Sequence, residues 1–201
     1  DLCRIRRGRP VCIRLFAPPL RECLPAGRAG HRELAESLDI PVSEVTRRVE
    51  ALGEYNPMLG MRGVRLGVTV PEIYEMQARA IFEATIEASR EGDPVVPEIM
   101  IPLVSARREV ALVKARIDAV AAAVRSETGT DFAFRLGVMV ETPRAALRAA
   151  DIAPQVSFLS FGTNDLTQMT YGLSRDDAGR FMSDYVQQGV YPEDPFHTLD
   201  T

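Results

Sequence analysis

The later part of the chain alternates short apolar segments with helical patterns, and this alternation constrains the fold more than any other feature. Such an alternation builds a parallel sheet covered by helices, either doubly wound or closed into a barrel. We therefore expect an α/β fold. The apolar segments of strand length cover residues 98–102, 134–140 and 156–161, and the helical patterns between them cover 106–127 and 143–150.

The earlier part of the chain extends this pattern with longer interruptions. Residues 11–15 form an apolar segment that is followed by a proline pair. Residues 71–90 are predicted to form a long helix with proline in its first turn. Between them, residues 31–55 are predicted to be a helical insertion of two short helices. A length of 201 residues suits one domain over 1–201 with a sizeable core.

Composition excludes several classes of protein. The chain has 24 basic and 28 acidic side chains, a net charge of −4, and no apolar stretch long enough to span a bilayer. We expect neither a membrane nor a nucleic acid as partner. The single lysine, Lys114, lies outside any P-loop pattern, and two histidines are too few for a multi-histidine metal site.

The cysteines indicate a reducing compartment. There are three, an odd number crowded near the start of the chain, and they lack the spacing of metal ligands. We therefore predict no disulfide framework and no zinc site, and we expect a cytoplasmic protein. The cysteines are Cys3, Cys12 and Cys23.

Two acidic residues follow neighbouring predicted strands. Glu141 comes directly after the segment 136–140, and Asp165 follows the segment 157–161. In parallel α/β folds the carboxyl ends of the strands hold the active site. Two carboxylates there suit Mg²⁺, which takes one or two carboxylates together with substrate oxygens. The alternative is that each acid only caps the helix that starts beside it.

Two arginines are candidate anion binders. Arg14 lies within an apolar strand, where burial of its charge requires a negative partner. Arg62 stands between Gly60 and Gly63, which allow the backbone to approach a ligand closely. The alternatives are a structural ion pair for Arg14 and a solvated loop for Arg62. The turn at 162–165 adds backbone N–H groups that can receive an anionic oxygen at a helix start.

Five segments, in chain order, carry recognisable motifs: Arg14–Leu20, Asn56–Gly63, Glu98–Pro102, Val140–Ala145 and Ser160–Gly179. Together they resemble the pyruvate, phosphate dikinases, which belong to the PEP-utilising enzymes. The stretch from Gly162 to Gln168 is shared with phosphoenolpyruvate synthase and phosphoenolpyruvate–protein phosphotransferase, so these remain alternatives. The Pro-Pro-Leu segment at 18–20 and the segment from Ser174 to Gly179 favour the dikinases.

The resemblance implies an incomplete TIM (β/α)8 barrel, with parallel strands and outer helices, that lacks its first and last elements and binds phosphoenolpyruvate or pyruvate. Glu141 and Asp165 match Mg²⁺ ligands that also bind substrate. Arg14 and Arg62 match catalytic residues that bind substrate. The remaining substrate-binding positions match Gly162, Thr163 and Asn164.

The implied reaction interconverts ATP, phosphate and pyruvate with AMP, diphosphate and phosphoenolpyruvate. A phosphohistidine on another domain of the same chain carries the phosphoryl group, and the parent is expected to be a homodimer. We expect this chain to be a piece of a longer protein, with the phosphohistidine, the nucleotide site and a proton-donating cysteine lying elsewhere. The isolated chain is then expected to be inactive as an enzyme.

Two positions depart from the family pattern. Ala17 stands where an aspartate is expected before the proline pair, and Met61 stands where a histidine is common. Both departures alter the surroundings of the predicted arginines Arg14 and Arg62.

Two hypotheses of another class remain. Residues 32–38 and 45–49 resemble a helix-turn-helix that binds DNA, although the acidic residues among them dilute the positive charge that phosphate contact requires. Alternatively, the chain is a non-catalytic fragment, because a (β/α)8 barrel usually takes about 250 residues.

Overall fold

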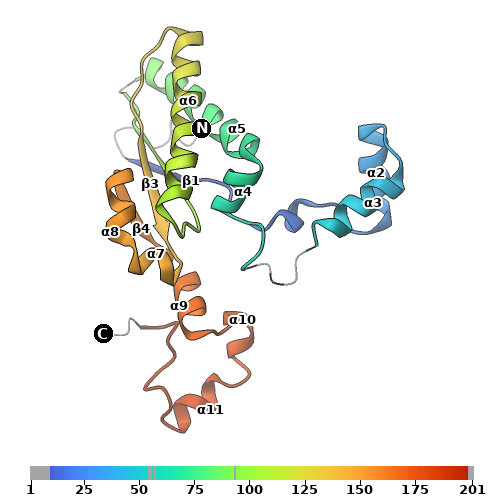
Figure 1. The fold of residues 1–201 in the computed structure, drawn as a ribbon, viewed down its shortest axis with the longest axis vertical. Coiled ribbons are helices and arrows are strands. Elements are labelled where there is room, and N and C mark those ends of the chain that lie inside the picture. The colour runs from blue at the N-terminus through green and yellow to red at the C-terminus, as the bar shows by residue number, and fades with distance from the viewer. Residues whose placement is uncertain (1–9, 54–55, 57, 93, 199–201) are drawn as a thin grey trace.

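The computed structural model describes residues 10–53, 56, 58–92 and 94–198. Cys3 and Pro57 lie outside the described residues. The described strands form one parallel sheet in the order β1-β2-β3-β4, with helices between consecutive strands (Figure 1). The predicted parallel α/β fold is therefore confirmed. The strands are β1 (Val11–Arg14), β2 (Pro97–Ile101), β3 (Arg135–Val140) and β4 (Phe158–Phe161).

The helices between the strands agree with the periodicity, with two exceptions. The predicted helix at 143–150 is broken at Arg148 into two short helices, and a further short helix, which we did not predict, covers 64–69. The helices are α4 (Val64–Thr69), α5 (Pro71–Arg90), α6 (Arg107–Thr128), α7 (Pro143–Leu147), α8 (Ala149–Ile152) and the 3₁₀ turn η2 (Ala153–Gln155).

The core lies between one face of the sheet and helices α5 and α6. Ile99, Val138 and Val140 alternate along β2 and β3 toward this core and are at most 2% exposed. The Phe82 ring of α5 packs against the rings of Phe132 and Phe134, with 4.9 Å between centroids in each pair. Burial of this apolar face holds the strand ends of the site in fixed positions.

The region predicted to be a helical insertion lies in an arm of the chain that projects away from the sheet (Figure 1). It holds the 3₁₀ turn η1 (Leu20–Cys23), α2 (Gly27–Leu38) and α3 (Val42–Ala51), so its first α-helix starts four residues before the predicted boundary at His31. The charge of Arg48 is paired with Glu44 on the same helix. This pairing weakens the helix-turn-helix hypothesis, since that charge is already compensated.

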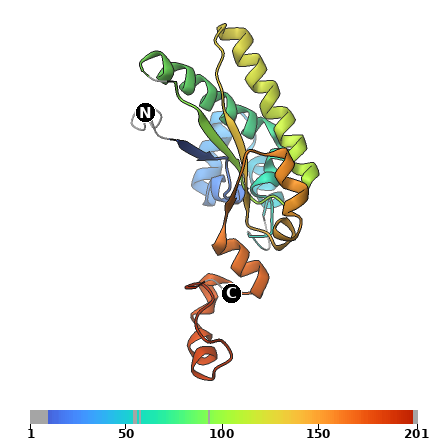
Figure 2. The ribbon, with the colours of Figure 1, turned by 90° about the vertical axis from the view of Figure 1, so that its left-hand side faces the viewer.

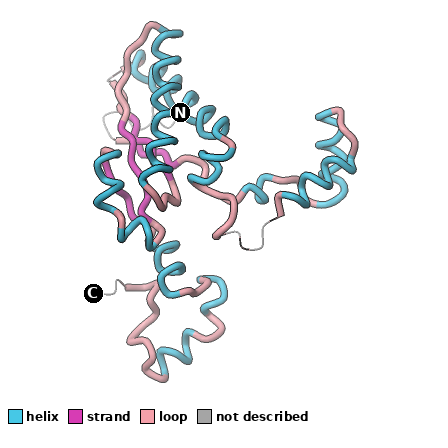
Figure 3. Tube along the Cα trace, in the orientation of Figure 1, coloured by secondary structure: helices cyan, strands magenta, loops and turns pink. Residues whose placement is uncertain are grey.

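The chain leaves the sheet through α9 (Thr163–Tyr171), and the segment beyond it extends away from the sheet (Figures 1 and 2). Figure 3 shows how much of this segment is loop between two short helices, α10 (Arg175–Ala178) and α11 (Met182–Gln187). The Tyr171 and Tyr185 rings both contact Tyr191. Among the described residues, no helix combines the length and apolar character needed to cross a membrane.

Candidate functional site

The carboxyl edge of the sheet brings the two predicted carboxylates together. Glu141 directly follows β3, and Asp165 lies in the first turn of α9, directly after the adjacent strand β4. The capping alternative is wrong for both residues. The N-cap of α7 is Thr142, whose hydroxyl accepts from the Ala145 N–H, and the N-cap of α9 is Gly162.

Glu141 is a buried acid with an unfavourable environment for its charge. Its side chain is 3% exposed, and its Oε1 accepts a hydrogen bond of 2.6 Å from the backbone N–H of Leu103. The pKa of Glu141 is raised to about 7, because burial and the nearby Asp165 carboxyl outweigh the lowering effects of the Leu103 N–H and the Arg14 charge. Two carboxyl groups this close create a demand for a positive charge.

The backbone around Glu141 is closely packed. Leu103 has a φ of 58°, in the left-handed region that a leucine rarely adopts, and this conformation accompanies its hydrogen bond to Glu141. Gly63 opposite has a φ of 57°, and a Cβ there would lie 2.7 Å from the Leu103 Cβ. A Cβ at Gly162 would lie 2.5 Å from Glu141 Oε2. Both glycines are therefore required for this arrangement.

The donor set suits Mg²⁺. The described residues hold no group of three or more histidine, cysteine and acidic side chains, which is the pattern of a metal site supplied entirely by protein. Mg²⁺ does not need such a cage, because it binds through one or two carboxylates and fills its other positions with water or substrate oxygens. Glu141 and Asp165 are hard oxygen donors, and a cation between them would relieve their repulsion.

The two predicted arginines lie at the same end of the sheet in different environments. Arg14 is exposed, so the expectation of a buried charge that needs a partner is wrong, because no element of the described structure covers this face of β1. Its charge nevertheless lowers the pKa of Glu141. Arg62 is half-buried, and its Nε donates a hydrogen bond of 3.2 Å to the Ala17 carbonyl.

A wide cleft lies beside the carboxylates. Its volume is about 1280 Å³, and Arg62, Asn164 and Asp165 are among the residues that line it. Thr163 and Asn164 occupy the first turn of α9 together with Asp165, so the backbone N–H groups of that turn lie at the helix start. The predicted anion-binding turn and the predicted arginine Arg62 therefore meet at one cleft.

Sequence reasoning missed two contributors to this site. Arg175 donates from Nη1 to the Asn164 Oδ1 at 2.8 Å, and its backbone N–H donates to the Gln168 Oε1 at 2.9 Å. Arg175 belongs to the segment from Ser174 to Gly179, which supported the resemblance but suggested no role for it. Leu103 acts through its backbone N–H, and a donor of this kind cannot be predicted from the residue type.

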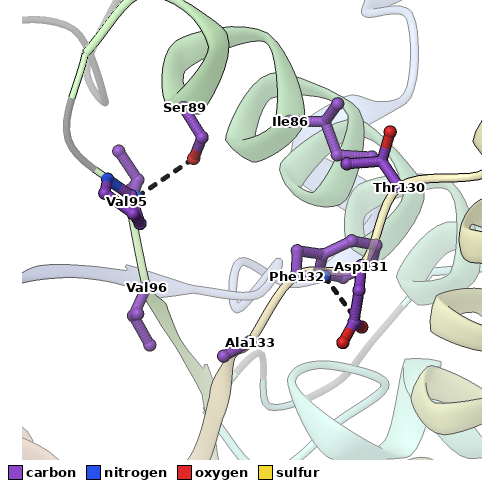
Figure 4. Close-up of a pocket in the computed structure, with 9 residues that line it drawn as sticks. Ile86, Ser89, Val95, Val96, Thr130, Asp131, Phe132 and Ala133 are labelled. Atoms are coloured by element: carbon purple, nitrogen blue, oxygen red, sulfur yellow. Dashed lines mark hydrogen bonds between the residues drawn. The ribbon is translucent and has the colours of Figure 1, made fainter.

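A smaller cavity lies at the opposite ends of β2 and β3. It has a volume of about 370 Å³ and is mainly apolar, with Ile86, Val95 and Phe132 among its lining residues. Figure 4 shows its two hydrogen bonds, from Val95 N–H to the Ser89 hydroxyl and from Phe132 N–H to Asp131. No predicted site residue lines it.

Replacing Glu141 with glutamine should stabilise the metal-free domain at high pH. Folding raises the pKa of Glu141 from 4.5 to about 7, so the stability gained from its proton is complete below pH 4.5 and is lost as the pH rises through 7. Glutamine stays neutral, so Glu141→Gln should exceed the wild type in unfolding free energy by about 3 kcal/mol at pH 8. Below pH 4.5 the wild type and Glu141→Gln should have the same free energy of unfolding.

Urea denaturation in the presence of a chelator, at pH values from 4 to 8, measures this difference. Glu33→Gln, on the exposed surface of α2, is the control and should match the wild type at each pH. A Glu141→Gln protein that is no more stable than the wild type at pH 8 would contradict the role of burial.

Comparison with known proteins agrees with the resemblance. The family model for the PEP-binding domain of PEP-utilising enzymes matches residues 2–199. Pyruvate, phosphate dikinase of Rhizobium meliloti (strain 1021) is 54% identical over 201 residues, which cover 100% of this chain and 22% of that protein. The dikinase of Clostridium symbiosum is 50% identical over 194 residues, covering 96% of this chain and 22% of that protein.

The chain thus spans about a fifth of the length of these curated relatives. Among solved structures, a citrate lyase from Burkholderia xenovorans LB400 is 23% identical and covers 57% of this chain and 44% of its own, with a TM-score of 0.37 that is too low to assign a shared fold. The family match, in contrast, covers nearly every residue. This chain therefore belongs to the PEP-utilising enzymes, as their PEP-binding domain.

Proposed function

We propose that this domain provides the pyruvate and phosphoenolpyruvate site of a pyruvate, phosphate dikinase. The observation that carries the proposal is the pair of Glu141 and Asp165 on adjacent strand ends, with Asp165 and Arg62 both lining one cleft. Relatives about 50% identical across the chain are dikinases, which supports this enzyme over the synthase and the phosphotransferase.

The proposal includes the incomplete (β/α)8 barrel over residues 1–201. Its support is the sequential order of four parallel strands with crossover helices, the arrangement that successive units of such a barrel have. In this proposal the arm of α2 and α3 is a helical insertion. The remaining strands, the phosphohistidine domain and the second subunit of a homodimer belong to the full-length protein that carries this domain.

In the half-reaction at this site, pyruvate gives a methyl proton to the cysteine expected elsewhere in the full-length protein, and its enolate oxygen attacks the phosphorus of phosphohistidine. The phosphorus–nitrogen bond breaks, and its electron pair returns to the histidine ring. When bound by Glu141 and Asp165, Mg²⁺ supplies Lewis-acid stabilisation of the charge on pyruvate.

The side chains of this chain orient the reactants. Backbone N–H groups of the turn at Thr163 and Asn164 can receive the pyruvate carboxylate at the start of α9. The Arg62 guanidinium lines the cleft and stabilises the phosphoryl group as it passes between partners. Arg14, exposed at the end of β1, adds positive charge near Glu141.

Asp165→Ala should abolish the pyruvate half-reaction in the full-length protein, because it removes one of two proposed metal ligands. Histidine phosphorylation by ATP and phosphate takes place at another site and should be intact. Phosphoryl exchange between labelled phosphoenolpyruvate and pyruvate measures the pyruvate half-reaction. Formation of labelled phosphoenzyme from ATP and phosphate measures histidine phosphorylation. Asp118→Ala, on the surface of α6, is the control. Unchanged pyruvate turnover in Asp165→Ala would refute the proposed site.

Arg62→Lys should lose much of the catalytic rate while it keeps the fold. Lysine retains the charge but cannot reproduce the planar fork that binds phosphate in a bidentate manner. Loss of one such contact removes roughly 2–4 kcal/mol of transition-state stabilisation, on the order of 10²- to 10³-fold in rate. Arg108→Lys, exposed at the start of α6, is the matched control. A rate within about threefold of the wild type would contradict a contact between Arg62 and the phosphoryl group, since threefold is under 1 kcal/mol.

A further inference from the structure

The chain leaves β1 at a residue whose two backbone groups are both held by side chains of α5. The Leu15 N–H still donates to the Met100 carbonyl of β2 at 2.9 Å. At Phe16 the sheet no longer provides partners. The Phe16 N–H donates to Gln77 Oε1 at 3.0 Å, and the Phe16 carbonyl accepts from the Tyr74 hydroxyl at 3.0 Å. Together these bonds fix the peptide groups on both sides of the Phe16 Cα.

The Tyr74 hydroxyl has no freedom to point elsewhere. The side chain is 2% exposed, and its ring packs directly on α4 at Gly67, where a Cβ would lie 2.4 Å from Tyr74 Cδ2. Gln77 lies three residues later on α5, on the same side of the helix. The two side chains therefore approach Phe16 from the same helix, whose inner face packs in the core.

We call the hydrogen bonds of Tyr74 and Gln77 to the Phe16 backbone the clamp. Ala17, the next residue along the chain, binds Arg62. The Ala17 carbonyl accepts the hydrogen bond from Arg62 Nε, and Ala17 is 4% exposed. Because Pro18 follows, the backbone of residue 17 is restricted to extended conformations. With Phe16 fixed on one side and proline on the other, the Ala17 carbonyl has one orientation.

We propose that Tyr74 and Gln77 are positioning residues, which hold the backbone of Phe16 so that the Ala17 carbonyl fixes Arg62 at the cleft. This bond uses only the Nε of the Arg62 guanidinium, which has two further nitrogens. The proposal rests on the proposed function, in which Arg62 contacts the phosphoryl group. The Tyr74 hydroxyl also lies near the charges of Arg14 and Glu141, which places the clamp directly behind the site.

Tyr74→Phe tests the clamp, because it removes the hydroxyl and keeps the ring that fills the core. In the full-length protein it should lower kcat for phosphoryl exchange between phosphoenolpyruvate and pyruvate by about tenfold, the usual effect of losing a supporting contact behind a site. The KM for pyruvate should change less than about threefold, since the lost interaction belongs to the transition state. Tyr185→Phe, in the segment beyond α9, is the control and should match the wild type.

A double variant distinguishes positioning from a general loss of packing. Lysine at position 62 has no Nε–H donor, so Tyr74→Phe added to Arg62→Lys should change the rate less than about twofold further. A full tenfold loss in that background would show that Tyr74 acts independently of Arg62 and would overturn the proposal. Wild-type kcat in Tyr74→Phe would also overturn it.

The stability of the variants and the status of the proposed function are checked separately. If Tyr74→Phe does not fold by circular dichroism, Gln77→Met removes the other half of the clamp and must show the same loss of kcat and the same coupling to Arg62. If Asp165→Ala retains pyruvate turnover, the proposed function fails. If Asp165→Ala is inactive while both clamp variants behave as the wild type, only the positioning proposal fails.

Discussion

A buried carboxylate beside a second carboxylate is the constraint around which this domain is organised. Burial of Glu141 disfavours its charged form, and Asp165 adds repulsion, so in the metal-free domain the acid retains its proton to about pH 7. A fold maintains such an unfavourable group only where other interactions hold it in place. Here these are the Leu103 N–H, the Arg14 charge and a sheet whose helix-facing side packs in the core.

The backbone near Glu141 shows what that constraint requires. Leu103 adopts a left-handed conformation that disfavours a side chain, and its N–H is thereby aimed at Glu141. Gly63 leaves room for Leu103, and Gly162 leaves room for the Glu141 carboxylate itself. Val64 N–H donates to the Pro102 carbonyl at 3.0 Å, which ties the loop after β2 to the start of α4. Arg62 precedes this junction, so the loop that holds the acid also places the arginine.

The sequence was sufficient to predict the sheet and the position of the acid pair. Apolar segments that alternate with helices specify a parallel sheet, and residues that follow adjacent strands meet at its carboxyl edge, as Glu141 and Asp165 do. Helix α4 was not predicted, because glycines such as Gly63 and Gly67 are typical of loops. In the structure Gly67 lies inside that helix, where the absence of a side chain lets Tyr74 pack against it. The Leu103 N–H was beyond prediction, because it depends on φ and not on residue type.

The exposure of Arg14 follows from the same sheet and bears on the proposed barrel. Alternation along β1 sends Cys12 and Arg14 to the face opposite the helices, where both are exposed. In a closed barrel this face is the interior, so further strands would remove Arg14 from water, as Glu141 already is. Attraction between opposite charges strengthens as the effective dielectric constant falls. Closure would therefore strengthen the effect by which the Arg14 charge lowers the pKa of Glu141 and opposes the effect of burial.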